Sequence, residues 1–183
     1  MRQNRGALSW LATGAAMLML ATVFVGGAQG TVGAESVPDD SAVEQSAERA
    51  RPSNDMLARS RLHTGPRWTH FGNNYGATLQ RCERALSHGR RGGASVWFRW
   101  RSGRTQRVII DTPPGRTNFD TVLGVYRGRG MCRFTRIAGN DDAPGYGLQS
   151  RVQFRAIRGR MYYIAVDGYR GDMGRYGLRI RRA

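Results

Sequence analysis

The segment Gln149 to Ile157 reads Gln-Ser-Arg-Val-Gln-Phe-Arg-Ala-Ile. From Val152 onward every second residue is apolar, and the residues between them are glutamine or arginine. Successive side chains of a strand point to opposite faces of a sheet, so this period of two predicts a strand with one buried and one exposed face. The same period recurs along the C-terminal half of the chain, and it therefore decides the fold class.

Six further segments show this alternation, or a short apolar run, between residues typical of turns. They are Ala94 to Arg101, Gln106 to Asp111, Phe119 to Tyr126, Met131 to Ala138, Arg160 to Asp167 and Arg175 to Arg181. Only Asp55 to Leu62 has the character of a helical turn. Seven short strands without a long helix predict an all-β fold, a two-sheet antiparallel β-sandwich of the jelly-roll kind.

The N-terminal segment has the features of an export signal. Arg2 and Arg5 precede an apolar run over residues 7–25, and small residues follow at Ala28 and Ala34. We expect a signal peptide over residues 1–34, with an uncleaved membrane anchor as the alternative, because the run is long. Residues 35–51 are acidic and lack aromatics, which is typical of a flexible linker. The remaining residues, 52–183, form the predicted domain.

The chain contains two cysteines, Cys82 and Cys132. Export would place both in an oxidising compartment, where an even number of cysteines is usually bridged. We expect a disulfide between them, with two buried free thiols as the alternative. Neither has the spacing of a redox or zinc motif. The export signal also predicts a secreted or periplasmic location.

The formal net charge is +16, and all 29 basic residues are arginine. From residue 52 onward there are 25 arginines against eight acidic residues. Such an excess favours an acidic partner, such as a nucleic acid, the phosphates of lipopolysaccharide, an acidic glycan or an anionic membrane. No specific nucleic-acid motif is present. Solubility alone is the alternative explanation.

Some arginines alternate with apolar residues on the predicted strands, so their side chains are expected on exposed faces. The candidate binding residues are Arg99, Arg101, Arg151, Arg155, Arg179 and Arg181. Guanidinium groups bind phosphate, sulfate and carboxylate through paired hydrogen bonds. The alternative is a solvated face that keeps sheet edges from pairing. Which arginines share a face depends on strand order.

The common catalytic motifs HExxH and GxSxG are absent, and His63, His70 and His88 are too dispersed for a local metal motif. No catalytic residue is therefore predicted. Four aspartates fit turn or strand-edge positions that one end of the sandwich would bring together: Asp120, Asp141, Asp142 and Asp167. They would form paired carboxylates or a cation site, or would accept backbone N–H groups in turns, which is the favoured role.

Exposed aromatic side chains would offer a stacking platform for sugars or bases. Most aromatics fall on the parity that packs inward. Trp97 shares the parity of Arg99, so it is predicted to be exposed. Phe71, Tyr146 and Tyr169 lie near glycine-rich turns and are expected to be exposed as well.

Eight phrases of residues 52–183 occur in a characteristic order. They are Asn54-Asp55, Gly72 to Thr78 with Glu83, Ala94 to Trp97, Asp111-Thr112, Phe119 to Tyr126, Asn140 to Asp142, Ser150 to Phe154 and Tyr162 to Tyr169. In this order they resemble the bacterial pre-peptidase C-terminal domain. The resemblance implies a jelly-roll-like β-sandwich that serves as an accessory module of secreted proteases and other hydrolases.

The resemblance also implies a calcium site near the start of the domain, at Asn54 and Asp55. Residues 50–53 lack the acids that precede this pair in the relatives that bind calcium, and two side chains supply too few oxygen ligands. Capping of a turn is the alternative role. No other cofactor is expected.

These observations predict a non-catalytic secreted or periplasmic binding module that engages a polyanion through its arginines. The alternative is a structural or secretion-helper domain that acts beside a separate secreted hydrolase. Direct hydrolysis by an atypical carboxylate site is the least favoured function. The sequence does not specify an oligomeric state.

Overall fold

The computed structural model of the chain describes residues 51–83 and 92–183. The predicted signal peptide at 1–34, linker residues 35–50 and His88 lie outside the described residues. Within the described part, no helix is long and apolar enough to cross a membrane.

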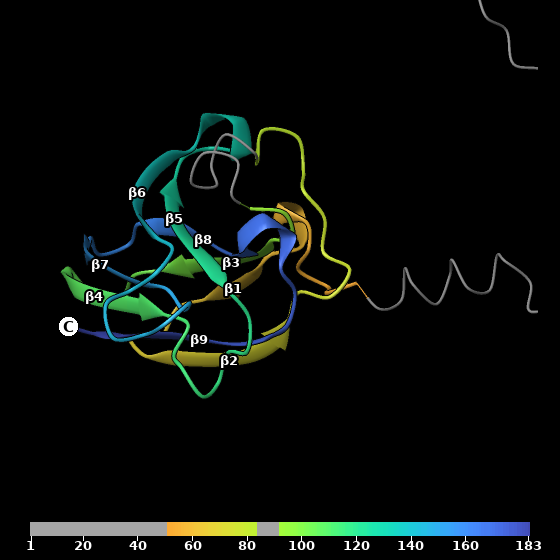
Figure 1. Cartoon of the computed structure of the whole chain (residues 1–183). Helices are drawn as coiled ribbons and strands as arrows, with labels where there is room; N and C mark the ends of the chain where they lie inside the picture. The colour runs from red at the N-terminus through yellow and green to blue at the C-terminus, as the bar shows by residue number, and fades with distance from the viewer. Residues whose placement is uncertain (1–50, 84–91) are drawn as a thin grey trace, which may run out of the picture. The chain divides into compact units, whose positions relative to one another are not determined.

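Two sheets make up the described part of the chain (Figure 1). The five-stranded sheet has the order β1-β3-β8-β5-β6, and the four-stranded sheet has the order β2-β9-β4-β7. All pairings are antiparallel except the parallel contact of β1 with β3. The strands are β1 Arg61–His63, β2 Trp68–Asn73, β3 Val96–Arg101, β4 Gln106–Asp111, β5 Thr121–Arg127, β6 Thr135–Asn140, β7 Arg151–Ala156, β8 Met161–Gly168 and β9 Arg175–Arg182. The predicted two-sheet β-sandwich is confirmed.

In the part of the chain that the structure describes, 3₁₀ turns include η1 Leu57–Arg59, η3 Met131–Arg133 and η4 Tyr169–Gly171. The turn η1 lies within the segment predicted to be a helical turn. The prediction of a strand from Met131 to Ala138 was wrong in its first part, because η3 occupies Met131–Arg133 and β6 begins at Thr135. Gly130, with φ +152°, precedes η3 and redirects the chain there.

Strands β1 and β2 were not predicted from the sequence. β1 has only three residues, which is too short for a recognisable period. In β2 the inward positions hold Trp68, His70 and Gly72 rather than a run of aliphatic residues. A side chain at Gly72 would collide with Tyr176, whose Oη would lie 2.7 Å from the added Cβ, so this position accepts only glycine. The inward face of β2 therefore fits the structure through close contact of Gly72 with Tyr176 of β9, and β2 lacks the apolar alternation by which a strand is recognised in a sequence.

The main core lies between the inner faces of the two sheets. Its largest buried aromatic side chains are Phe98, Trp100, Tyr162 and Tyr176. The polar atoms of two of them are satisfied, because Trp100 Nε1 donates to the Gly65 carbonyl at 2.9 Å and Tyr162 Oη accepts from the Ile157 N–H at 2.9 Å. The core thus buries aromatic surface without losing these hydrogen bonds.

A second apolar cluster covers the outer face of the five-stranded sheet. Trp97, Tyr126, Met131 and Ala165 are buried there, and Phe134 packs against them. Trp97 is fully buried, so the prediction that it would be exposed was wrong. Its parity places it on the outer face, as expected, but the segments around η1, Cys82 and η3 cover that face.

Glu83 is the buried acid of this second cluster, with 1% of its surface exposed. Its carboxylate accepts hydrogen bonds from Ser95 Oγ, from Trp97 Nε1 at 2.8 Å and from the Gln80 N–H at 2.6 Å. Burial raises the pKa of the Glu83 carboxyl, and these hydrogen bonds oppose the rise. The carboxylate is thus the common acceptor that fixes Trp97 beneath its cover.

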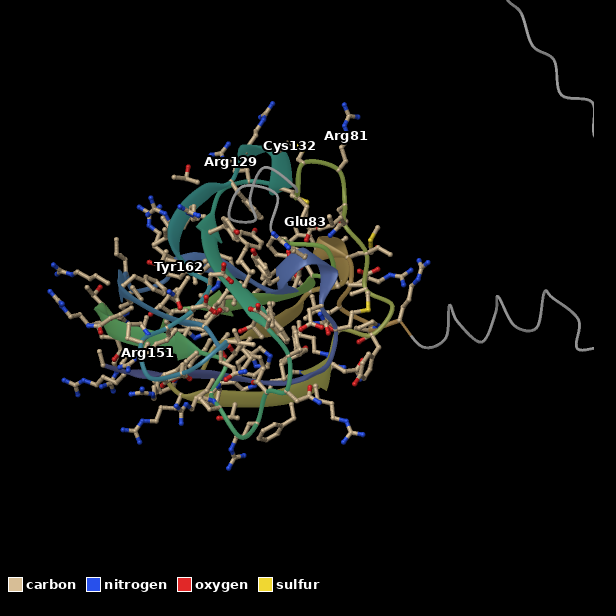
Figure 2. The ribbon with its side chains drawn as sticks, in the orientation of Figure 1. Arg81, Glu83, Arg129, Cys132, Arg151 and Tyr162 are labelled. Carbon is tan, nitrogen blue, oxygen red and sulfur yellow. A yellow bond between two sulfur atoms is a disulfide. The ribbon has the colours of Figure 1, made fainter. Side chains whose placement is uncertain are left out.

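Cys82 and Cys132 form a disulfide, as predicted, and the alternative of two free thiols was wrong. Their Cα atoms are 5.1 Å apart although the residues are 50 positions apart in sequence. Cys132 is labelled in Figure 2, close to Glu83. The bridge ties the segment that follows β2 to η3, and so it holds the cover over Trp97.

Replacing both cysteines, by Cys82→Ser and Cys132→Ser, should lower the free energy of unfolding by about 4 kcal/mol, because the loop closed by the bridge restricts the unfolded chain. Denaturant titration followed by tryptophan fluorescence measures this loss. A loss well under 1 kcal/mol would contradict the structural role given to the bridge.

Glu83→Ala should lower the free energy of unfolding by about 2 to 4 kcal/mol, because Trp97 Nε1 and the Gln80 N–H lose their buried acceptor. Exposed Asp172 supplies a matched control, since Asp172→Ala removes an acid of similar size from the surface. Thermal and denaturant unfolding of both variants would test this. Equal losses in the two variants would refute the role of Glu83.

Candidate anion-binding face

The outer face of the four-stranded sheet carries arginines on three adjacent strands. Among them are Arg107 on β4, Arg151 and Arg155 on β7, and Arg179 and Arg181 on β9. In each strand the intervening residues point into the core, as Val108, Val152 and Ile180 do. The period of two therefore directs all five guanidinium groups outward. We call these five residues the arginine face.

Asp111 is the one acid on this face among the described residues, and it is fully buried. Its carboxylate accepts two hydrogen bonds from Arg179, at 2.9 and 2.8 Å, and one from Tyr146 Oη at 2.9 Å. Arg181 Nη2 lies 3.5 Å from the same carboxylate. The hydrogen bond to Asp111 raises the pKa of Arg179. Arg179 thus compensates the buried charge of Asp111 and is less available to a ligand.

Arg107 and Arg155 differ from Arg179 because neither forms an ion pair with an acid in the part of the chain that the structure describes. They lie directly opposite each other on β4 and β7, and both are exposed. Cβ atoms of such cross-strand pairs are about 5 Å apart, and like charges in this position destabilise a sheet. The pair lines a surface depression of about 510 Å³ with Thr105, Gln106, Gln153 and Phe154. One sulfate, phosphate or carboxylate group placed there would be within reach of both guanidinium groups.

The structure brings together four of the six predicted arginines: Arg151, Arg155, Arg179 and Arg181. Arg99 and Arg101 lie on β3, in the other sheet. The Nε and Nη2 atoms of Arg99 donate to the Ser60 carbonyl at 3.2 and 2.9 Å, which gives this residue a structural contact. Arg107 was missed by the sequence analysis, although its parity in the predicted strand pointed outward.

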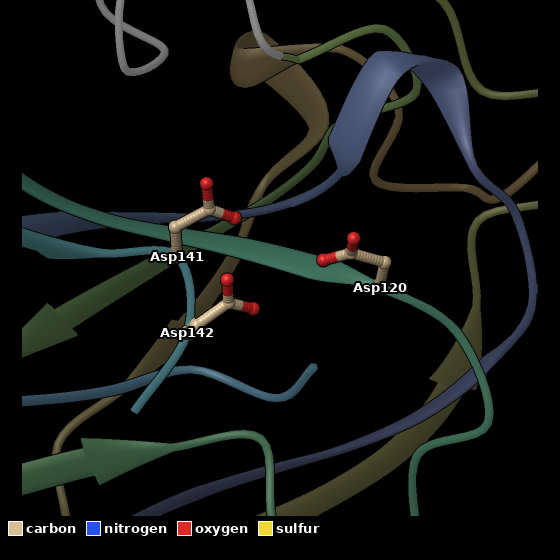
Figure 3. A group of neighbouring side chains, drawn as sticks. All are labelled: Asp120, Asp141 and Asp142. Atoms are coloured by element: carbon tan, nitrogen blue, oxygen red, sulfur yellow. The ribbon is translucent and has the colours of Figure 1, made fainter. Parts of the chain in front are cut away.

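Three of the four predicted aspartates meet where β5 begins and β6 ends (Figure 3). Oxygens of Asp120, Asp141 and Asp142 lie within 4.8 Å of one another. Desolvation, followed by the charges of Asp141, Asp142 and Asp172, raises the pKa of Asp120 to about 6. These carboxylates could supply some of the six to eight oxygens that a calcium ion requires.

Asp167 does not belong to this acidic cluster. Its carboxylate accepts hydrogen bonds from the backbone N–H groups of Gly93, Ala94 and Gly168 at 2.8 to 2.9 Å. It therefore has the turn-stabilising role that the sequence analysis favoured.

Asn54 and Asp55 are both buried and make hydrogen bonds within the protein. Asn54 Nδ2 donates to the Trp97 carbonyl at 3.1 Å, and Asp55 Oδ1 accepts from the Thr78 N–H at 2.7 Å. Both contacts reach residues far along the chain, and η1 has Met56 at its N-cap without a side-chain hydrogen bond, so these contacts do not cap that turn. Calcium binding at this pair stays a prediction.

The described histidines pack against aromatic rings. His63 stacks on Trp68 with 3.5 Å between ring centroids, and His70 lies 5.5 Å from the same ring. Burial lowers the pKa of both histidines. Of the aromatics predicted to be exposed, Phe71 is 56% exposed, whereas Tyr146 and Tyr169 are half-buried.

Comparison with known proteins yields similarities of fold. No protein-family model matches the sequence, and no curated protein matches it. One similar solved structure is the pre-peptidase C-terminal domain of a collagenase from Bacillus anthracis, with 14% identity and a TM-score of 0.44 over 67% of this chain and 94% of that chain. Another is PliG of Aeromonas hydrophila, a periplasmic inhibitor of g-type lysozyme, with 14% identity and a TM-score of 0.42 over 68% of this chain and 99% of that chain. The first of them is a domain of the kind that the sequence phrases resemble.

Asp120 should titrate near pH 6, and Asp141→Asn should lower the pKa of Asp120, because the charge of Asp141 is the largest cause of the raised pKa after desolvation. Because folding raises the pKa of Asp120, the ionised carboxyl opposes folding at pH values above about 6. This unfavourable contribution decreases as the pH falls from about 6 towards 3.8, and the folded state gains stability over that range. Carboxyl ¹³C NMR across a pH series measures the pKa directly. An unchanged pKa in Asp141→Asn would contradict the coupling.

Proposed function

We propose that this chain is an exported, non-catalytic binding module that holds an anionic partner on its arginine face. The observation that carries the proposal is the opposed pair Arg107 and Arg155, which is exposed and has no ion pair with an acid of the described residues. A sheet gains no stability from two like charges in register, whereas an anionic group between them would turn repulsion into two charge-assisted hydrogen bonds.

Neighbouring residues extend this pair into a larger surface. Arg151 is exposed on the same strand as Arg155, with its guanidinium carbon 5.7 Å from the centroid of the Tyr146 ring. Arg181 keeps a third of its side-chain surface exposed. Several positive groups spaced along strands suit a partner that repeats its negative charges, which supports a polyanion rather than a single small anion.

The disulfide supports an acidic glycan over a nucleic acid as that polyanion. Bridged cysteines are typical of proteins outside the cytoplasm, where envelope and matrix glycans carry sulfate, carboxylate and phosphate groups. The packing of His63 and His70 against Trp68 supports the non-catalytic part of the proposal, because it gives these half-buried potential general bases a packing role.

The test compares heparin binding by the chain and by the double variant Arg107→Gln with Arg155→Gln across a salt series. Losing two anion contacts should reduce the slope of log affinity against log salt by about two. The matched control is Arg59→Gln with Arg170→Gln, which removes the same charge from exposed positions on η1 and η4.

Equal losses in the double variant and its control would show that net charge alone governs binding, and would defeat the proposal. Salt-independent co-purification with a secreted hydrolase, without heparin binding, would instead favour the helper role.

A further inference from the structure

Two strand connections lie side by side at one end of the sandwich. Residues 102–105 join β3 to β4, and residues 157–160 join β7 to β8. The Ser102 N–H donates to the Arg160 carbonyl at 3.1 Å, and the Gly159 N–H donates to the Ser102 carbonyl at 2.7 Å. The Arg158 N–H donates to Thr105 Oγ1 at 3.0 Å. These bonds hold the two connections together as one rigid surface.

The connection from β5 to β6 adjoins this surface. Arg127, Gly128 and Arg129 line a depression of about 360 Å³ together with Arg160 and Met161 from the β7–β8 side. Register agrees with this placement, because Arg101 at the end of β3 pairs with Met161 at the start of β8. Three connections therefore meet at the same end.

The side chains on these connections are strongly basic. We call the following residues the basic end: Arg101, Arg104, Arg127, Arg129, Arg158 and Arg160. Five of the six are exposed, and Arg127 is half-buried. None of them forms an ion pair with a carboxylate of the described residues.

The acids gather at the other end of the strands. All eight acids of the described residues lie there: Asp55, Glu83, Asp111, Asp120, Asp141, Asp142, Asp167 and Asp172. Asp111 ends β4, Asp120 precedes β5 and Asp141 follows β6. Within residues 51–83 and 92–183, no acid therefore compensates the positive charge of the basic end, and this separation of charge would orient the molecule towards an anionic surface before contact.

Ile157 adds an apolar element to the basic end. It follows the last residue of β7, and its side chain is 42% exposed beside Arg158. An exposed aliphatic side chain among arginines suits the boundary of a bilayer, where apolar groups enter the acyl region and guanidinium groups remain with the phosphates. A soluble polyanion would gain little from this side chain.

We propose that the basic end docks onto a phospholipid bilayer with anionic phosphate headgroups, and that Ile157 enters the interface. This surface goes beyond the proposed function, because none of its residues belongs to the arginine face. Charge complementarity selects the headgroups, and the exposed isoleucine selects a bilayer over a polymer in solution.

The test measures co-sedimentation of the exported chain with phosphatidylcholine vesicles, with and without phosphatidylglycerol. Binding should require phosphatidylglycerol. Arg104→Gln with Arg158→Gln should weaken it by about fivefold for each arginine removed, and the loss should shrink as salt rises. The charge-matched variant Arg59→Gln with Arg170→Gln should bind almost as the parent chain does.

Ile157→Gln should weaken vesicle binding by about tenfold at every salt concentration, because the lost contribution is hydrophobic. Leu148→Gln is the matched control, since Leu148 is 54% exposed and lies near Thr121, at the acidic end. Heparin binding should be unchanged by Ile157→Gln. Circular dichroism of each variant checks that the fold is retained.

Docking by the basic end would be overturned if substitution of Arg104, Arg158 and Ile157 left vesicle binding unchanged while Arg107→Gln with Arg155→Gln abolished it. That outcome would leave the proposed function of the arginine face standing. A second contrary outcome combines two results: the double variant Arg104→Gln with Arg158→Gln loses heparin binding, and Ile157→Gln leaves vesicle binding unchanged. This outcome would identify a soluble polymer as the ligand of the basic end and overturn the bilayer proposal. Vesicle binding without heparin binding would uphold the basic end and defeat the proposed function of the face.

Discussion

Burial of aromatic side chains between the two sheets is the interaction on which the rest of the structure depends. Phe98 and Tyr176 meet edge to face with ring centroids 6.2 Å apart, and Trp100 lies 5.7 Å from Tyr162. Once these rings face inward, the period of two leaves every intervening side chain on an outer face. The arginines that alternate with core residues are thereby displayed by the same pattern that builds the core.

The separation of charge along the strands has a structural cause at the acidic end. The connections there are stabilised by carboxylates that accept backbone N–H groups, as Asp55 does from Thr78 and Asp167 does from Ala94. At the basic end the β7–β8 connection closes through backbone hydrogen bonds and Gly159, whose φ is +76°. No carboxylate is needed in that connection, so the arginines there have no acidic neighbours among the residues that the structure describes.

The sequence predicted the seven strands whose apolar alternation is strong, together with the disulfide, because two cysteines allow a single pairing. It did not reveal β2, where Gly72 packs closely under Tyr176. Alternation assigns a side chain to one of two faces but does not say what covers that face, and for this reason Trp97 was misplaced. Alternation also does not give strand order. Strand order places Arg99 in the other sheet from Arg155, and it makes β4 and β7 neighbours so that Arg107 lies opposite Arg155.

The two candidate surfaces adjoin within a single stretch of chain. Arg155 belongs to the arginine face, Ile157 and Arg158 belong to the basic end, and one residue separates Arg155 from Ile157. Because Arg158 and Gly159 are hydrogen-bonded to the β3–β4 connection, the two surfaces keep a fixed relation to each other. A module held on a bilayer by its basic end would therefore present the arginine face at a constant height above the membrane. An anionic partner at that height would bind the arginine face without the entropy cost of a free encounter. Two individually weak electrostatic contacts on this rigid edge would then give a combined affinity that neither surface provides alone.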